Sequence, residues 1–143
     1  MILPITMTMA GAATLLNIWL GFRVGQMRKA HRVSIGDGGA QPLLARMRAQ
    51  ANFVEYTPFF LILLGLIELA AGSATWLWAV GAVYILARLC HAFGMDRGPG
   101  NRLRTIGAVL TGLLLGGLAI YALVLPYLER PRPATPVSQI RAA

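Results

Sequence analysis

The sequence predicts an all-α integral membrane protein that folds as a four-helix bundle. Apolar residues make up 57% of the 143-residue chain and charged residues only 13%, whereas a soluble domain carries about 25% charged residues. The mean hydropathy is +0.63, and the charges lie between long uncharged runs. Because one membrane-spanning helix needs about 20 residues, the apolar residues suffice for four spans. For the chain as a whole, these observations exclude a disordered tail segment, a disulfide-rich secreted scaffold and an ordinary soluble enzyme.

The first element is a helix near residues 2–27, because residues 1–22 carry no charge. Arg23 falls close enough to the end of this helix for its guanidinium to reach the membrane interface by snorkelling. The segment is not a convincing cleavable signal peptide, since it lacks a basic start and its apolar run is too long.

The second and third elements form a helical hairpin that a tight turn joins. Glu68 is the one charged residue within residues 56–87, so this stretch is long enough for two spans. Ser73 or Thr75 is the expected N-cap of the third helix. We place the two helices near residues 50–71 and 75–94.

The fourth element is a helix near residues 104–127, because residues 105–128 are uncharged. Small residues on this helix permit close packing against a neighbouring helix, and they are Gly107, Thr111, Gly112, Gly116 and Gly117. We therefore expect a single transmembrane domain over residues 1–128, followed by a Pro-rich, disordered tail over residues 129–143.

Basic residues set the expected orientation in the membrane. The amino terminus and the second loop contain no Lys or Arg. The first loop contains Arg28, Lys29, Arg32, Arg46 and Arg48, and the third contains Arg97, Arg102 and Arg104. By the positive-inside rule, loops one and three face the cytoplasm and both termini lie outside. The net charge of +8 does not indicate nucleic-acid binding, because these basic residues separate apolar spans.

Polar residues line one face of the second helix near its cytoplasmic end. Arg48, Asn52, Glu55 and Tyr56 are spaced three and four residues apart and therefore share one stripe, with Gln50 on the opposite side. An ionisable residue inside a membrane faces the bundle interior and has a partner, so an arginine is expected beside Glu55. One interpretation of this stripe is an internal Glu–Arg pair that fixes helix packing.

The third helix repeats this pattern with Tyr84, Arg88, His91 and Met95. Arg88 lies about two turns from the loop and either snorkels towards the interface or pairs with Glu55. No metal site is expected, because no second histidine or acidic cluster lies at a ligand spacing from His91. No intrachain disulfide can form, because the chain has a single cysteine.

Arginines greatly outnumber carboxylates at the cytoplasmic helix ends. These arginines are Arg28, Arg48, Arg88, Arg102 and Arg104, with Asn52, Glu55 and Tyr56 between them. Several guanidinium groups beside apolar walls suit a small ligand with carboxylates and a thiolate, while Glu55 suits an ammonium group. Anionic lipid headgroups are the main rival ligand, because basic clusters beside a membrane attract them.

At these residues the chain resembles the MAPEG family, the membrane-associated proteins in eicosanoid and glutathione metabolism. The resemblance runs from about Arg28 to Thr111. The helix-two signature R-x-x-x-N-x-x-E-Y-x-P is matched from Arg48 to Pro58, and the stretch from Arg88 to Gly94 resembles the helix-three signature. The loop over residues 32–39 is similar to that of uncharacterised bacterial members, which implies a bacterial inner membrane location.

The resemblance implies a homotrimer of four-helix subunits with a glutathione site between neighbouring subunits near the cytosolic face. The positions that match glutathione-binding positions of the family are Arg48, Asn52, Glu55 and Tyr56 on helix two, Arg88 and His91 on helix three, and Arg28 at the end of helix one. Glutathione would be a co-substrate.

The resemblance also implies a catalytic arginine near the start of the fourth helix. Counted from Arg88, both Arg102 and Arg104 match this position in different members, and Arg104 is preferred because the apolar run begins just after it. Met95 and His91 stand where some members carry tyrosines, so a hydroxyl that binds the thiol is not supplied at these two positions.

Three classes of function follow from the sequence. The first is a glutathione transferase or peroxidase in which arginine stabilises the thiolate, which attacks a small lipophilic electrophile or a lipid hydroperoxide. The second is a non-catalytic membrane protein that binds anionic lipid or braces a complex. The third is a proton-coupled or multidrug transporter, for which Glu68 is the candidate acid, although a packing or interfacial role is favoured for this residue near the far membrane face.

Overall fold

The computed structural model describes residues 2–98 and 100–128, which form four helices. They are α1 (Pro4–His31), α2 (Gln41–Ala71), α3 (Thr75–Asp96) and α4 (Arg102–Leu128). Each helix is long and apolar enough to cross a membrane, so the four expected spans are confirmed. The tail expected to be disordered, residues 129–143, lies outside the described residues.

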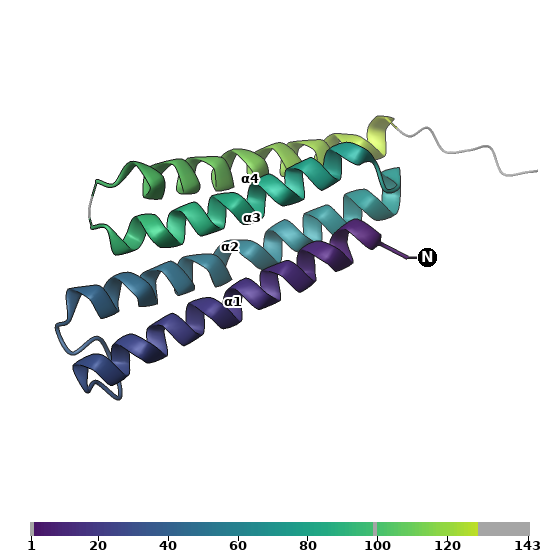
Figure 1. Ribbon diagram of the computed structural model, residues 1–143. Coiled ribbons are helices and arrows are strands. Elements are labelled where there is room, and N and C mark those ends of the chain that lie inside the picture. The colour runs from purple at the N-terminus through teal and green to yellow at the C-terminus, as the bar shows by residue number, and fades with distance from the viewer. Residues whose placement is uncertain (1, 99, 129–143) are drawn as a thin grey trace, which may run out of the picture.

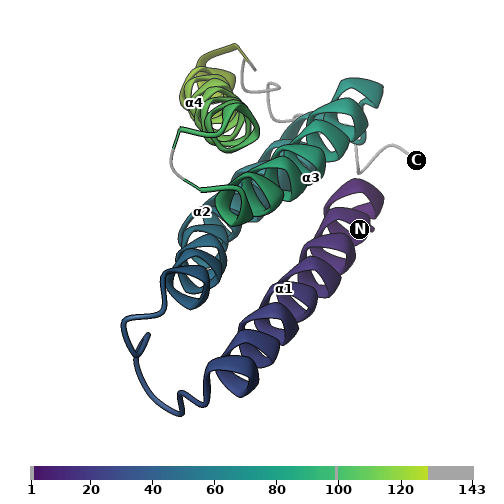
Figure 2. The ribbon, with the colours of Figure 1, turned by 60° about the vertical axis from the view of Figure 1, so that its left-hand side comes forward.

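The helices run up and down, so that the connections alternate between the two ends of the bundle (Figure 1). The α1–α2 and α3–α4 loops lie at one end, as both basic loops must if they share one side of a membrane. The amino terminus and the α2–α3 turn lie at the other end. Figure 2 shows α1 and α4 on opposite sides of the central pair α2 and α3.

Helix α2 begins at Gln41, well before the expected start near residue 50. Arg46 and Arg48 therefore lie on a helix and not in the first loop. The intervening Leu, Ala, Arg, Met and Gln residues all favour helix, and Pro42 stands in the first turn, where its missing N–H costs nothing. The first two turns of α2 thus project basic side chains beyond the apolar span.

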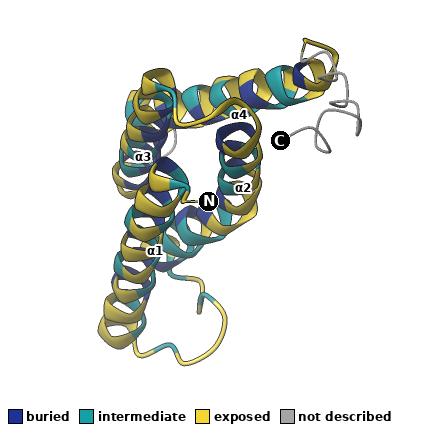
Figure 3. Ribbon diagram, turned by 90° about the vertical axis from the view of Figure 1, so that its right-hand side faces the viewer, coloured by how far each residue is buried: buried dark blue, intermediate teal, exposed yellow. Residues whose placement is uncertain are grey.

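Apolar side chains pack in two layers between the helices. The layer nearer the amino terminus includes Phe60 and Tyr84, whose rings stack with centroids 3.7 Å apart. The second layer lies towards the basic loops and includes Leu20 and Phe53. Figure 3 shows the buried positions facing inward and the exposed ones covering the outer faces, where large apolar residues suit contact with lipid.

The α2–α3 turn is built around Glu68, which is only 1% exposed. Its carboxylate accepts hydrogen bonds from the backbone N–H groups of Ile5 and Thr6 at 3.0 and 2.8 Å, from the Thr6 hydroxyl at 2.7 Å and from the Ser73 hydroxyl at 2.8 Å. The N-cap expectation for Ser73 or Thr75 was wrong, because Ala74 caps α3 without a side-chain bond. Ser73 instead binds Glu68, which satisfies free donors at the start of α1.

Candidate functional site

A cleft of about 490 Å³ opens at the end of the bundle that carries the basic loops. It lies where α2 and α4 begin and α1 and α3 end. Apolar side chains such as Met27, Leu44 and Met95 form much of its wall. Its charged side chains are Arg46, Arg48, Asp96 and Arg104. The structure thus brings two predicted site residues, Arg48 on α2 and Arg104 on α4, to one cleft.

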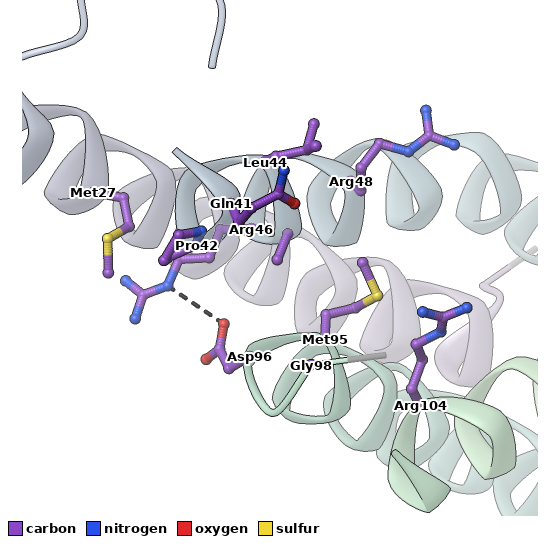
Figure 4. A pocket seen from close by; sticks show the side chains of 11 residues that line it. Met27, Gln41, Pro42, Leu44, Arg46, Arg48, Met95, Asp96, Gly98 and Arg104 are labelled. Carbon is purple, nitrogen blue, oxygen red and sulfur yellow. Dashed lines mark ion pairs between the residues drawn. The ribbon is translucent and has the colours of Figure 1, made fainter. Parts of the chain in front are cut away.

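Asp96 is the centre of an ion cluster at one side of the cleft. Its Oδ2 accepts a hydrogen bond from Arg23 of α1, and its Oδ1 lies 3.4 Å from Nε of Arg46 on α2. Arg46 also donates from Nη1 to the backbone carbonyl of Arg23 at 3.1 Å. Figure 4 shows Arg46 and Asp96 joined, with Arg48 and Arg104 apart from this pair. The cluster ties three helices together beside the cleft.

Arg23 does not snorkel to the interface as expected, because it is 6% exposed. Its guanidinium lies 4.5 Å from the ring centroid of Trp19 and 5.7 Å from that of Phe93. Two aromatic rings and the Asp96 carboxylate therefore compensate its charge within the bundle. Neither Arg23 nor Asp96 was a predicted site residue.

Arg88 is buried at 2% exposure and holds α2 and α4 to α3. It donates from Nη2 to Oδ1 of Asn52 at 2.8 Å and from Nη1 to the Thr111 hydroxyl at 3.3 Å, and it lies 5.8 Å from the Phe53 ring. The expectation that Arg88 snorkels or pairs with Glu55 was wrong. The helix-two stripe supplies a neutral amide as its partner instead of a carboxylate.

Helix α4 approaches α3 closely where two glycines replace side chains. A Cβ at Gly94 would lie 2.2 Å from the backbone nitrogen of Arg104, and one at Gly107 would lie 2.6 Å from the backbone nitrogen of His91. His91 is 7% exposed, and its Nδ1 has no hydrogen-bond partner among the described residues. This contact places His91 beneath the first turns of α4, near Arg104.

The remaining predicted residues lie outside the cleft. Glu55 and Tyr56 are exposed on α2, and the arginine expected beside Glu55 is not found within residues 2–98 and 100–128. Arg28 binds the first loop, donating to the carbonyls of Ser34 and Gly36 at 3.3 and 2.9 Å. Arg102 is exposed and does not line the cleft.

Two signals in the sequence point to the missed ion cluster. The chain has only five acidic residues, so a charged residue inside the first span has few possible partners. Arg23 also follows Trp19 by four residues, which places both on one helix face. The sequence did not predict that Arg23 pairs with Asp96, which lies 73 residues further along the chain.

The profile of the MAPEG family matches residues 6–124, most of the chain. This chain belongs to the MAPEG family. The match includes α2, α3 and most of α1 and α4, and it contains every arginine of the predicted site as well as the Arg23–Asp96 cluster. The resemblance read from the helix-two and helix-three motifs is therefore confirmed.

Among curated proteins, this MAPEG chain is similar to the inner membrane protein YecN of Escherichia coli strain K12, with 35% identity over 83 residues. The aligned stretch covers 57% of this chain and 63% of YecN. The YecN protein of the E. coli O6:H1 strain CFT073 matches with the same identity and coverage. The aligned part thus spans less than two thirds of each curated relative.

Proposed function

We propose that this protein is a membrane-bound glutathione transferase or peroxidase. The observation that carries this proposal is the cleft that both Arg48 and Arg104 line beside apolar walls. Its volume of about 490 Å³ falls within the range of small-molecule sites. Membership of the MAPEG family, which includes glutathione transferases, supports the same reaction class.

The arrangement of charges suits glutathione as a co-substrate. Glutathione carries two carboxylates, one ammonium group and one thiol. Arg48 and Arg104 form no ion pair within residues 2–98 and 100–128, so their forked guanidiniums remain available for carboxylate or thiolate. Glu55 would hold the ammonium group and Tyr56 would donate a neutral hydrogen bond. Arg28 would contribute from the end of α1, and Arg88 with His91 would support the site from α3.

Arg104 is the residue that we assign to thiolate stabilisation, with Arg102 as the alternate. Arg104 lines the cleft and Arg102 does not, which supports the preference. A free thiol has a pKa of about 8.5, so only a few percent is thiolate at neutral pH. A guanidinium at a few ångströms favours the charged form and lowers the pKa of the thiol.

The thiolate would then attack an apolar electrophile that arrives from the lipid. In conjugation, sulfur forms a bond to the electrophilic carbon, and the leaving group departs with the pair of the broken bond. In peroxide reduction, sulfur attacks the terminal peroxide oxygen, the O–O bond breaks, and the departing alkoxide takes a proton from water to become the lipid alcohol. A second glutathione then converts the resulting sulfenic acid to glutathione disulfide and water.

We propose that three copies assemble through α2. Its exposed residues Glu55, Phe59, Ile62, Leu66 and Leu69 follow at spacings of four and three. This is the heptad pattern by which helices pack against copies of themselves. A carboxylate within a span requires a partner, and in such an assembly a second subunit or the glutathione ammonium group would supply one for Glu55. A trimer would bring the exposed Glu55 and Tyr56 of one subunit against a neighbouring subunit, so that the site extends across the interface.

An inner membrane location is part of the proposal, with loops one and three in the cytoplasm and both termini outside. The excess of arginine at the loop end of the bundle supports this orientation. The name of the similar YecN protein, an inner membrane protein, supports the location. Cytosolic glutathione would then reach the cleft directly.

Binding of glutathione to the detergent-purified protein tests the proposal. The conservative variant Arg48→Lys keeps the charge and removes the bidentate fork. We expect saturable binding at millimolar glutathione or below, and a loss of about tenfold in affinity for Arg48→Lys, which corresponds to about 1.4 kcal/mol. Absence of binding, or an Arg48→Lys protein with unchanged affinity, would contradict the proposal. Vesicle binding that depends on charge alone would favour the anionic lipid alternative.

A further inference from the structure

Asp96 is the one carboxylate among the residues that line the cleft, which three arginines also line. It is fixed from two sides, because Arg23 on α1 and Arg46 on α2 both bind it. Arg23 is buried between aromatic rings, so the negative charge of Asp96 is required in place whether or not a ligand is bound. The carboxylate is still 30% exposed, and its charge acts on whatever enters the cleft.

The Arg46 guanidinium is already bound by other groups of the protein. Its guanidinium is shared between Oδ1 of Asp96 and the backbone carbonyl of Arg23. An anion in the cleft therefore meets two guanidiniums without an ion pair among the described residues, those of Arg48 and Arg104, and one fixed negative charge. This balance of charges limits the net negative charge that a ligand in the cleft can carry.

We propose that Asp96 sets the charge selectivity of the cleft, which accepts organic anions with a net negative charge of one or two, as a glutathione thiolate has, and disfavours those with a larger net charge. This inference deepens the proposed function, on which its relevance to glutathione rests. The geometry itself concerns any anion of this size. At a separation of about 6 Å and the dielectric constant of water, one unit charge changes the affinity for another by about threefold.

The test compares two ligands with the same apolar ring, benzoate with one carboxylate and trimesate with three. Their affinities for the full-length, detergent-purified protein are measured from the shift in thermal unfolding midpoint with ligand concentration. We expect Asp96→Asn to raise the ratio of trimesate to benzoate affinity by about tenfold, since two extra ligand charges no longer meet a carboxylate. Arg46→Gln leaves Asp96 less compensated and should lower the ratio.

Two controls remove the same charges at the same end of the bundle without touching the cleft. The controls are Asp37→Asn and Arg97→Gln. Asp37 lies in the first loop and Arg97 follows α3, and neither residue lines the cleft. Both should leave the ratio within twofold of the wild type. A cluster with a purely structural role would change both ligand affinities together and leave the ratio unchanged.

Asp96→Asn leaves the buried Arg23 without its carboxylate and can prevent folding, whereas Arg46→Gln keeps the Arg23–Asp96 pair. An unchanged ratio in Arg46→Gln, or a wild-type protein that binds neither ring compound, would overturn the inference. Glutathione is titrated in parallel. A protein that shows the expected ratios but no glutathione binding would contradict the proposed function and leave the charge selectivity standing.

Discussion

Glu68 illustrates how a single carboxylate within a membrane span can be fully compensated without a cation. Two backbone N–H groups at the start of α1 and two hydroxyl groups surround its oxygens. The positive end of the α1 dipole adds to this stabilisation. Such a carboxylate joins α1 to α2, and the packing role favoured from the sequence is confirmed. A transporter would need an acid that exchanges protons, which this hydrogen-bonded geometry opposes.

The variant Glu68→Gln tests this assignment. Its amide nitrogen would face N–H and O–H donors, so at least one buried donor loses its acceptor. We expect a loss of about 2–3 kcal/mol in the free energy of unfolding, the cost of losing a buried hydrogen bond to a charged group. The measurement is the thermal unfolding midpoint in detergent, with the first-loop variant Asp37→Asn as the control. A midpoint equal to that of the wild type would contradict the capping role.

Residue-level contacts were the part of the site that the sequence predicted least well. Arg48 and Arg104, which charge and spacing predicted as site residues, line one cleft, because each stands near the loop end of its helix. The predicted partner of Arg88, Glu55, was wrong. Asn52 and Glu55 share one stripe of α2, and only the rotation of this helix about its axis decides which of them faces α3. The Arg23–Asp96 pair depends on the register between α1 and α3, which no local pattern encodes.

At the scale of elements, the contact between α3 and α4 positions the candidate catalytic arginine. Gly94 and Gly107 allow the two backbones to approach without intervening side chains. The Thr111 hydroxyl lies on the same face of α4 and meets Arg88 of α3. The first turn of α4, which carries Arg104, is therefore fixed by backbone packing and one buried polar contact.

The variant Gly94→Ala should displace that first turn. Its Cβ would lie 2.2 Å from the backbone nitrogen of Arg104, and such overpacking costs about 1–3 kcal/mol. We expect a lower unfolding midpoint together with weaker glutathione binding. Gly112→Ala is the matched control, because no atom of another residue lies within 4 Å of its added Cβ. Equal glutathione affinities in the two variants would show that this contact does not position the site.

The number and order of the helices could be predicted because uncharged runs reveal membrane spans. The bounds were predicted less well at the end of the bundle with the basic loops, where α1 extends to His31 and α2 begins at Gln41. Helical turns that extend beyond the membrane span are as rich in arginine as a basic loop. Helix propensity favours helix in such a segment, but hydropathy does not distinguish the two.

At the scale of the whole molecule, one chain leaves much of α2 and α4 uncovered. Helix α4 packs on α3 and α2, and it makes no contact with α1 among the described residues. Its large apolar side chains face outward, as suits lipid. The exposed stripe of α2 differs, because it contains Glu55 at a heptad position. Self-association through α2 removes that carboxylate from lipid.

Disulfide crosslinking in the membrane distinguishes these two exposed faces. With Cys90→Ser as the background, Ile62→Cys on the α2 stripe should form crosslinked dimers on oxidation, because equivalent positions meet around the symmetry axis. Leu113→Cys on the outer face of α4 is the control and should remain monomeric. The mass of the native particle in detergent then counts the subunits. Crosslinking at residue 113 and none at 62 would contradict assembly through α2.

We propose that an arginine at the start of α4 holds glutathione as a thiolate. The ultraviolet absorbance of the thiolate, measured at neutral pH during a glutathione titration of the purified protein, tests this role. We predict a saturable thiolate band that Arg104→Ala abolishes, with Arg102→Ala as the comparison that decides between the two arginines. Bound glutathione without the band, or a band that persists in both variants, would contradict the claim.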